Sequence, residues 1–252
     1  MRRKKRLWKR SEDEGQQDGR MSMRQIYNNF RTFLSIDFER IEINTIDNYD
    51  GMVHKKTNKI PVSISARHVH LDRKALDILF GEGYELTVFK ELSQPGQYAS
   101  NEKVTIAGVR GSFEGVRVLG PLRRSSQVEI SMTDARKLGI NPPVRSSGDL
   151  AGSAPITIIG PAGVLVLKEG CIVAERHIHM SPADAEKYGV YDGEKVMVKI
   201  HNAKGGILDN VIIRVRDDFE LDMHIDTDDA NAFLIHNSDW IELIREEDGL
   251  EG

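Results

Sequence analysis

Apolar residues beyond position 60 fall in short alternating or continuous runs, which are separated by turn signals such as Gly-Pro and Asn-Ala-Lys-Gly-Gly. Runs bounded in this way are typical of β-strands, and many short strands at close spacing favour barrels. We predict strands over 60–65, 85–89, 103–107, 113–119, 127–131, 155–159, 163–167, 171–178, 195–200, 207–216 and 220–225.

Brief helices are predicted between some of these strands. The segment from Ser181-Pro182 to Gly189 has the N-cap serine, the proline at the first helical position and the C-terminal glycine of a two-turn helix. Thr133 to Gly139 repeats this design without the proline. The expected fold class is therefore mainly β with short α-helices.

The pattern before residue 60 is different. Apolar residues recur there at the i, i+3, i+4, i+7 spacing of an amphipathic helix, at Met23, Ile26, Tyr27, Phe30, Phe33 and Leu34. A polar segment, 37–59, separates this helix from the strands, so it is either a helix packed on the domain or a docking peptide on a linker. Residues 1–20 are almost wholly polar and are predicted to be a disordered tail.

Composition narrows the functional classes. The 252-residue chain has a net charge of -4, which does not favour a nucleic-acid partner. No stretch reaches the roughly 18 apolar residues of a membrane-spanning helix, and the N-terminus lacks the apolar core of a signal peptide, so we expect neither a membrane partner nor secretion. The single cysteine, Cys171, excludes an internal disulfide and is predicted to pack in the core rather than to act as a nucleophile.

The main functional signal is an internal repeat. Arg67-His68-Val69-His70 leads into a helix predicted to begin near Arg73, and Arg176-His177-Ile178-His179 leads into the helix predicted to begin at Pro182. Residues i and i+2 of a strand point to the same face, so each pair presents two imidazoles side by side. Imidazole nitrogens are common zinc ligands, and a catalytic zinc site leaves one position open. We therefore predict a metal-dependent enzyme.

Two further residues are candidate ligands. Val128-Glu129-Ile130-Ser131-Met132-Thr133 looks like a degenerate third copy of the repeat, and aligning Met132 with Met180 places Glu129 in register with His177. His224 lies in an alternating strand pattern, opposite in direction to its apolar neighbours.

A polar loop beside Glu129 offers groups for an anion. Gly120-Pro121-Leu122-Arg123-Arg124 precedes the strand that carries Glu129, and the planar guanidinium of arginine suits phosphate. A second loop, 143–149, offers hydroxyl and backbone donors, although turn formation explains it almost as well. P-loop, GxGxxG and GxSxG motifs are absent, which disfavours nucleotide kinases, dinucleotide oxidoreductases and serine hydrolases.

Together, Ile64-Ser65-Ala66-Arg67-His68-Val69-His70-Leu71, Gly120-Pro121-Leu122-Arg123, Gln127-Val128-Glu129-Ile130-Ser131 and Glu175-Arg176-His177-Ile178-His179-Met180 resemble the PduL-type phosphotransacylases, or phosphate propanoyltransferases. The resemblance covers about residues 59–235. It implies two β-barrels capped by short helices, one made of 56–66 with 175–244 and the other of 67–174, after an N-terminal segment over 21–55.

The resemblance also implies a site at the barrel interface with two zinc ions per chain. His68, His70 and Glu129 would hold one ion, and His177, His179 and His224 the other. Arg123 would bind phosphate as the catalytic residue. The substrate pocket for phosphate and coenzyme A would be lined by Ser65, Gln94, Gln97, Arg117, Gln127, Ser147, Arg214 and Asn231.

The reaction implied is reversible transfer of a short acyl group, propanoyl or acetyl, between coenzyme A and inorganic phosphate. A dinuclear zinc hydrolase of thioesters or phosphoesters and a non-catalytic zinc-stabilised binding module remain as alternatives.

The resemblance further implies that residues 23–34 bind a microcompartment shell or its cargo, placing the protein in the lumen of a bacterial microcompartment, with the cytoplasm as the alternative. We also expect a homo-oligomer.

Overall fold

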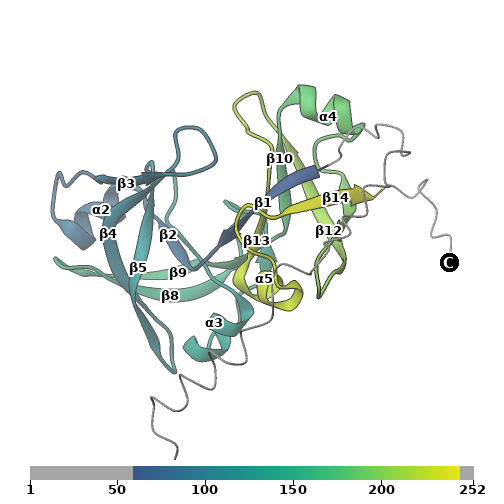
Figure 1. Cartoon of the computed structure of the whole chain (residues 1–252). Helices are drawn as coiled ribbons and strands as arrows, with labels where there is room; N and C mark the ends of the chain where they lie inside the picture. Colours follow the sequence, from purple (N-terminus) through teal and green to yellow (C-terminus); the bar gives the residue numbers. More distant parts are fainter. Residues whose placement is uncertain (1–58, 245–252) are drawn as a thin grey trace, which may run out of the picture. The chain divides into compact units, whose positions relative to one another are not determined.

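The computed structural model describes residues 59–244 (Figure 1). The predicted helix over residues 23–34 and the predicted tail over 1–20 lie outside this range. The strands and helices of the described region belong to one compact unit of the chain.

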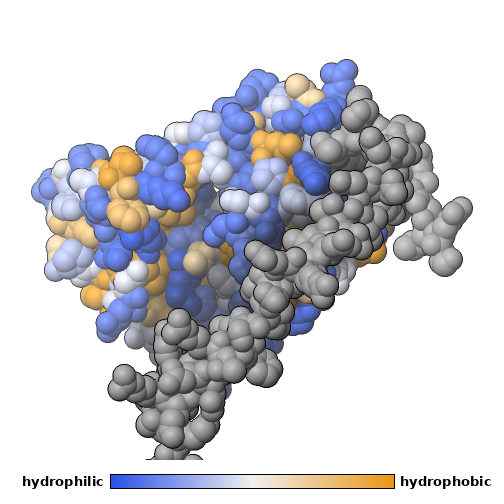
Figure 2. Space-filling view, viewed as in Figure 1, coloured by the Kyte–Doolittle hydropathy of each residue, from blue (hydrophilic) through white to orange (hydrophobic). Residues whose placement is uncertain are grey.

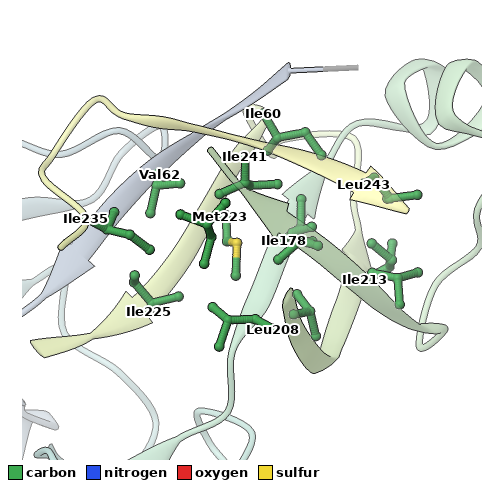
Figure 3. Packing of buried hydrophobic residues seen from close by; sticks show 14 of the residues in the cluster. Ile60, Val62, Ile178, Leu208, Ile213, Met223, Ile225, Ile235, Ile241 and Leu243 are labelled. Carbon is green, nitrogen blue, oxygen red and sulfur yellow. The ribbon is translucent and has the colours of Figure 1, made fainter. Parts of the chain in front are cut away.

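Six strands close the first barrel, in the order β1-β13-β10-β12-β11-β14. Their bounds are β1 Lys59–Ser65, β10 His177–Met180, β11 Lys195–Ile200, β12 Gly206–Val215, β13 Asp222–Asp226 and β14 Trp240–Ile244. Apolar side chains from alternate strand positions fill its interior, where Ile178, Met223 and Ile225 point toward one another (Figure 3). Burial of these side chains is the main force that holds the barrel together.

A second ring of six strands runs β6-β2-β5-β4-β8-β9 and closes through the β6–β9 pair. The bounds are β2 His68–His70, β4 Tyr98–Ala107, β5 Ser112–Gly120, β6 Gln127–Glu129, β8 Ala154–Ile159 and β9 Val164–Ala174, with β3 Val88–Glu91 and β7 Val144–Arg145 added at its edges. The predicted class, mainly β with two barrels and short helices, is confirmed. The face seen in Figure 2 is mainly polar, with small separate apolar patches.

In the described region, four short helices follow β2, β6, β10 and β13. They are α2 Arg73–Phe80, α3 Met132–Leu138, α4 Pro182–Tyr188 and α5 Thr227–Phe233. The predicted α4 is confirmed, with Ser181 as N-cap and Gly189 in the left-handed conformation at its end. The N-cap of α3 is Ser131 and not the predicted Thr133, because the Ser131 hydroxyl accepts the Asp134 amide at the first turn.

The two barrels share one topology. In the second barrel, the His-x-His strand β2 pairs in parallel with β5 and antiparallel with β6; in the first, the His-x-His strand β10 pairs in the same way with β12 and β13. The strand that precedes each His-x-His strand in the chain belongs to the other barrel: β1 pairs in parallel with β13, and β9 pairs in parallel with β6. The described chain is thus two similar halves that have exchanged their first strands.

This exchange explains one wrong boundary. The strands predicted over 163–167 and 171–178 are one continuous strand, β9, followed by a separate strand, β10. The break comes at 175–176, where the chain passes from one barrel to the other, as it also does at 66–67. Both His-x-His pairs therefore begin directly after a crossing between barrels.

Candidate active site

The first ligand cluster lies on β2 and β6. Their antiparallel register places His68 opposite Glu129, and His70 shares the face of His68. Nε2 of His68 is 3.5 Å from Glu129 Oε2, and Nε2 of His70 is 4.0 Å from Oε1. Nδ1 of His68 lies 2.8 Å from the Ala66 carbonyl, so it carries the proton and leaves the lone pair of Nε2 toward Glu129.

The second cluster repeats this arrangement on β10 and β13. His177 lies opposite His224, and the ring centroids of His177, His179 and His224 are 4.7 to 5.2 Å apart. Nδ1 of His177 lies 2.7 Å from the Glu175 carbonyl, in the same geometry as His68. Ligand atoms of each cluster lie within 4.8 Å of one another, which is the spacing that one cation would bridge.

Strand pairing corrects the register inferred from the sequence. Glu129 faces His68 as His224 faces His177, so Glu129 corresponds to His224 and not to His177. The degenerate third copy, which contains Glu129 on β6, therefore corresponds to the β13 segment that contains His224. The two clusters are the same construction with a carboxylate in one and an imidazole in the other.

The electrostatics of both clusters favour a bound cation. Burial, followed by the neighbouring histidines, lowers the pKa of His177 to about 4 and that of His179 to about 2, so these rings are neutral near pH 7. Burial alone would raise the pKa of Glu129, but His68, His70, the Ser147 hydroxyl and Arg123 lower it to about 2. Neutral imidazoles and an ionised carboxylate are the protonation states that ligate zinc.

An unpartnered donor atom supports the same fit. Within the described residues, Nδ1 of His179 is buried and has no hydrogen-bond partner. A buried polar atom without a partner costs free energy unless a ligand takes it. The donor set, three nitrogens in one cluster and two nitrogens with a carboxylate in the other, suits zinc.

A hydrogen-bond network surrounds Glu129. The Ser147 hydroxyl donates to Glu129 Oε1 at 2.6 Å, the Gln127 amide donates to the same oxygen at 2.5 Å, and Arg123 donates to Ser147 at 2.7 Å. Burial lowers the pKa of Arg123, although a guanidinium still keeps its charge near neutral pH. Arg123 is thus held one hydroxyl away from the first cluster, with a positive charge to offer an anion.

The matching position in the second cluster is Asp222. It stands two residues before His224, as Gln127 stands two before Glu129, and its Oδ2 lies 3.2 Å from Nε2 of His224 while accepting the Ser63 hydroxyl. The Gln127 amide thus donates to the Glu129 carboxylate, whereas Asp222 places a carboxylate beside the His224 ring, whose Nε2 has no hydrogen-bond partner among the described residues. Sequence reasoning missed Asp222, although its i−2 spacing from His224 placed it on the same strand face.

Both clusters open into a single cavity of about 820 Å³, which residues of the two barrels line. Of the predicted substrate residues, the cavity brings together Ser65, Gln94, Gln97, Arg117, Arg123, Ser147 and Arg214. Gln127 is buried behind the lining, and Asn231 is exposed on α5 outside it. Phe219 also lines the cavity and packs on His179 with ring centroids 4.1 Å apart, a contact that the sequence did not indicate.

Gln94 lines the cavity and also joins two loops of the protein. Its side-chain amide donates to the Glu220 carbonyl at 3.0 Å and accepts the Glu220 N–H at 3.3 Å. Gln94 belongs to the loop before β4, and Glu220 to the loop before β13, so the amide links the two barrels at the cavity. Both hydrogen-bonding ends of the amide are used within the protein.

Cys171 is buried in the core of the second barrel, and burial raises the pKa of its thiol to about 12. A thiol in this state is a poor nucleophile, because the thiolate is the reactive form. The helices of the described region are too short and too polar for any of them to cross a membrane.

Comparison with known proteins gives one consistent result. Residues 61–236 match the sequence model of the phosphate propanoyltransferase family. Proteins named phosphate propanoyltransferase are similar: one from Thermotoga maritima is 54% identical over 205 residues, covering 77% of this chain and 98% of that protein. One from Lachnoclostridium phytofermentans is 54% identical over 177 residues, with 70% and 83% covered. One from Listeria monocytogenes is 52% identical over 173 residues, with 69% and 81% covered.

Proposed function

Because this chain belongs to the phosphate propanoyltransferase family, we propose that it reversibly transfers a short acyl group, propanoyl or acetyl, between coenzyme A and inorganic phosphate. The observation that carries the proposal is the single cavity into which two three-ligand clusters and Arg123 converge. Such a cavity can hold an anion and a thioester side by side.

We also propose that each cluster holds one zinc ion, His68, His70 and Glu129 in the first and His177, His179 and His224 in the second. The neutral histidines, the ionised glutamate and the unpartnered nitrogen of His179 support this assignment. When bound, the ions would act as Lewis acids toward the carbonyl and phosphate oxygens.

The protein's own groups would bind and orient the two reactants. The Arg123 guanidinium, fixed through Ser147, would hold phosphate as a charged donor, and Arg214 adds positive charge to the same cavity. A phosphate oxygen would attack the thioester carbonyl carbon, the C–S bond would break, and coenzyme A would leave as the thiolate. Holding both reactants in one orientation lowers the entropic part of the barrier.

Transfer is proposed to be direct, without an acyl-enzyme. Cys171 has a raised pKa and does not line the cavity. Mass spectrometry of the protein during turnover tests this step, and detection of a covalent acyl adduct would contradict it.

The deciding experiment supplies purified protein with propanoyl-CoA or acetyl-CoA, with and without phosphate, and follows free thiol and acyl phosphate. We expect thiol release only with phosphate, together with an equal amount of acyl phosphate. Thiol release without phosphate and without acyl phosphate would instead identify a hydrolase. Absence of turnover in protein that carries two zinc ions would leave only a binding role.

We further propose that residues 21–55 direct the enzyme into a microcompartment, on the basis of the amphipathic pattern over 23–34. Deleting residues 1–47 should preserve transferase activity and abolish association with a shell. Loss of folding in the deletion variant would contradict the targeting role and favour a packing helix.

A further inference from the structure

Each half of the chain carries an arginine directly before its His-x-His pair. Arg67 precedes His68 and Arg176 precedes His177, and both lie in the short segments where the chain crosses from one barrel to the other. The carbonyl that orients the first histidine, of Ala66 or Glu175, belongs to the residue just before each arginine. The position of each arginine therefore bears on the direction of a ligand ring.

Both arginines make the same bidentate ion pair. Nε and Nη2 of Arg67 donate to Asp134 at 3.0 and 2.7 Å, and Nε and Nη2 of Arg176 donate to Asp229 at 2.9 and 2.8 Å. The carboxylates are largely shielded, with 6% and 18% of their side chains exposed. A paired fork of this kind fixes orientation as well as distance.

The two aspartates occupy equivalent places. Asp134 is five residues after the ligand Glu129, Asp229 is five after His224, and each is the third residue of its helix, α3 or α5. Each ion pair therefore joins the segment that orients the first ligand to the helix that follows the third ligand. Both halves therefore contain the same arginine–aspartate pair, although the third candidate ligand is Glu129 in one half and His224 in the other.

We propose that Arg67–Asp134 and Arg176–Asp229 are positioning pairs, each of which sets the zinc affinity of the cluster in its own half. The inference rests on the proposed dinuclear site. A guanidinium fork holds the crossing segment against the helix and so fixes two ligands that come from separate strands. Groups that orient metal ligands in this way typically change metal affinity by about 10- to 100-fold when they are removed.

Helix α4 offers a matched control. Asp184 is also the third residue of a helix that follows a ligand strand, but its carboxylate closes a capping box with Ser181 and contacts no arginine among the described residues. Asp184→Asn therefore disturbs a helix N-terminus without touching either pair.

The test measures zinc affinity by competition with a chromogenic chelator, one cluster at a time. In a His224→Ala background, which leaves the first cluster, we expect Asp134→Asn to weaken zinc binding about tenfold and Asp229→Asn to change it little. In a Glu129→Ala background, which leaves the second cluster, we expect Asp229→Asn to weaken zinc binding and Asp134→Asn to change it little. Asp184→Asn should leave both clusters unchanged.

Two further variants separate orientation from charge and from folding. Arg67→Lys keeps the charge but loses the fork, so we expect it to weaken the first cluster as Asp134→Asn does. Arg67→Gln combined with Asp134→Asn should be no worse than either single change, because both remove the same pair. Thermal unfolding of the metal-free variants reports any general loss of stability.

The possible results separate the two proposals. Equal weakening of both clusters by Asp134→Asn, or weakening no greater than that of Asp184→Asn, would overturn the positioning role and leave the dinuclear site standing. Arg67 lines the cavity and could instead contact a substrate. If Arg67→Lys raised the KM for phosphate or acyl-CoA without changing zinc affinity, the positioning role would also be overturned. Wild-type protein that binds no zinc would overturn both proposals.

Discussion

Imidazole rings become directed ligands only when their neighbours decide which nitrogen carries the proton. The carbonyls of Ala66 and Glu175 do this for His68 and His177, and they do so because each precedes its histidine by two residues at a crossing between barrels. The Gln127 amide donates to Glu129, and the Asp222 carboxylate lies 3.2 Å from Nε2 of His224. The direction of each candidate ligand thus depends on the groups that surround it.

Removing either third ligand should remove one metal ion. We expect Glu129→Ala and His224→Ala each to retain about one zinc ion per chain instead of two, because each leaves one complete cluster. Elemental analysis after gel filtration measures this. His236→Ala is a suitable control, since its side chain is 82% exposed and lies outside the cavity. Retention of both ions in either variant would refute the ligand assignment.

Arg123 should govern the use of phosphate without affecting the metal. We expect Arg123→Lys to lower kcat/KM for phosphate roughly a hundredfold, because a lysine ammonium cannot offer phosphate the planar, two-donor geometry of a guanidinium. Zinc content should stay at the wild-type value. The adjacent Arg124 is exposed and does not line the cavity, so Arg124→Lys should behave as wild type. Similar losses in both variants would show that general positive charge, and not Arg123, is required.

At the scale of elements, local signals predicted the helices better than the barrel edges. Ser181, Pro182 and Gly189 marked α4 because caps depend on residues within one or two turns. β14 was not predicted, although Trp240–Ile244 alternates in burial and completes the first barrel. Its partners β1 and β11 are distant in sequence, so pairing rather than local composition specifies it. The same limit explains why Glu129 was identified as a ligand but aligned with the wrong histidine.

The capping box of α4 should make a measurable contribution to stability. Ser181 accepts the Asp184 amide, and Asp184 accepts the Ser181 amide and hydroxyl. We expect Ser181→Ala to lower the free energy of unfolding by about 1 kcal/mol, measured by denaturant titration of the metal-free protein. Glu186→Ala, at an exposed position of the same helix, should have a much smaller effect. Equal effects would mean that the capping box contributes nothing at this site.

For the whole molecule, strand exchange accounts for where the site lies. Each half contributes its first strand to the other barrel, so both crossings, 66–67 and 175–176, run between the barrels. The His-x-His pairs follow those crossings directly, which brings two ligand clusters from separate barrels to one cavity. The repeat was visible in the sequence, but the exchange was not, because it depends on which barrel β1 and β9 join.

The burial of His177 and His179 should also make the metal-free protein sensitive to acid. The pKa of His177 is about 4 and that of His179 about 2 in the folded state, against about 6.5 for an exposed histidine. The unfolded chain therefore binds more protons than the folded one below pH 6.5. Stability from this source is fully present above pH 6.5 and is lost as the pH falls toward 4.

We expect the free energy of unfolding of the metal-free protein to fall as the pH is lowered from 7 to 5. The limiting slope is about 1.4 kcal/mol per pH unit for each of these two histidines. Glu129, whose pKa is lowered to about 2, adds to the loss only below its ordinary value near 4.5. Denaturant titrations at several pH values, with chelator present, measure the slope. His177→Gln removes one titrating group and should lower the slope by up to about 1.4 kcal/mol per pH unit. His236→Gln, at an exposed position, should not change the slope. A pH-independent stability over this range would show that the ligand histidines are solvated in the metal-free protein.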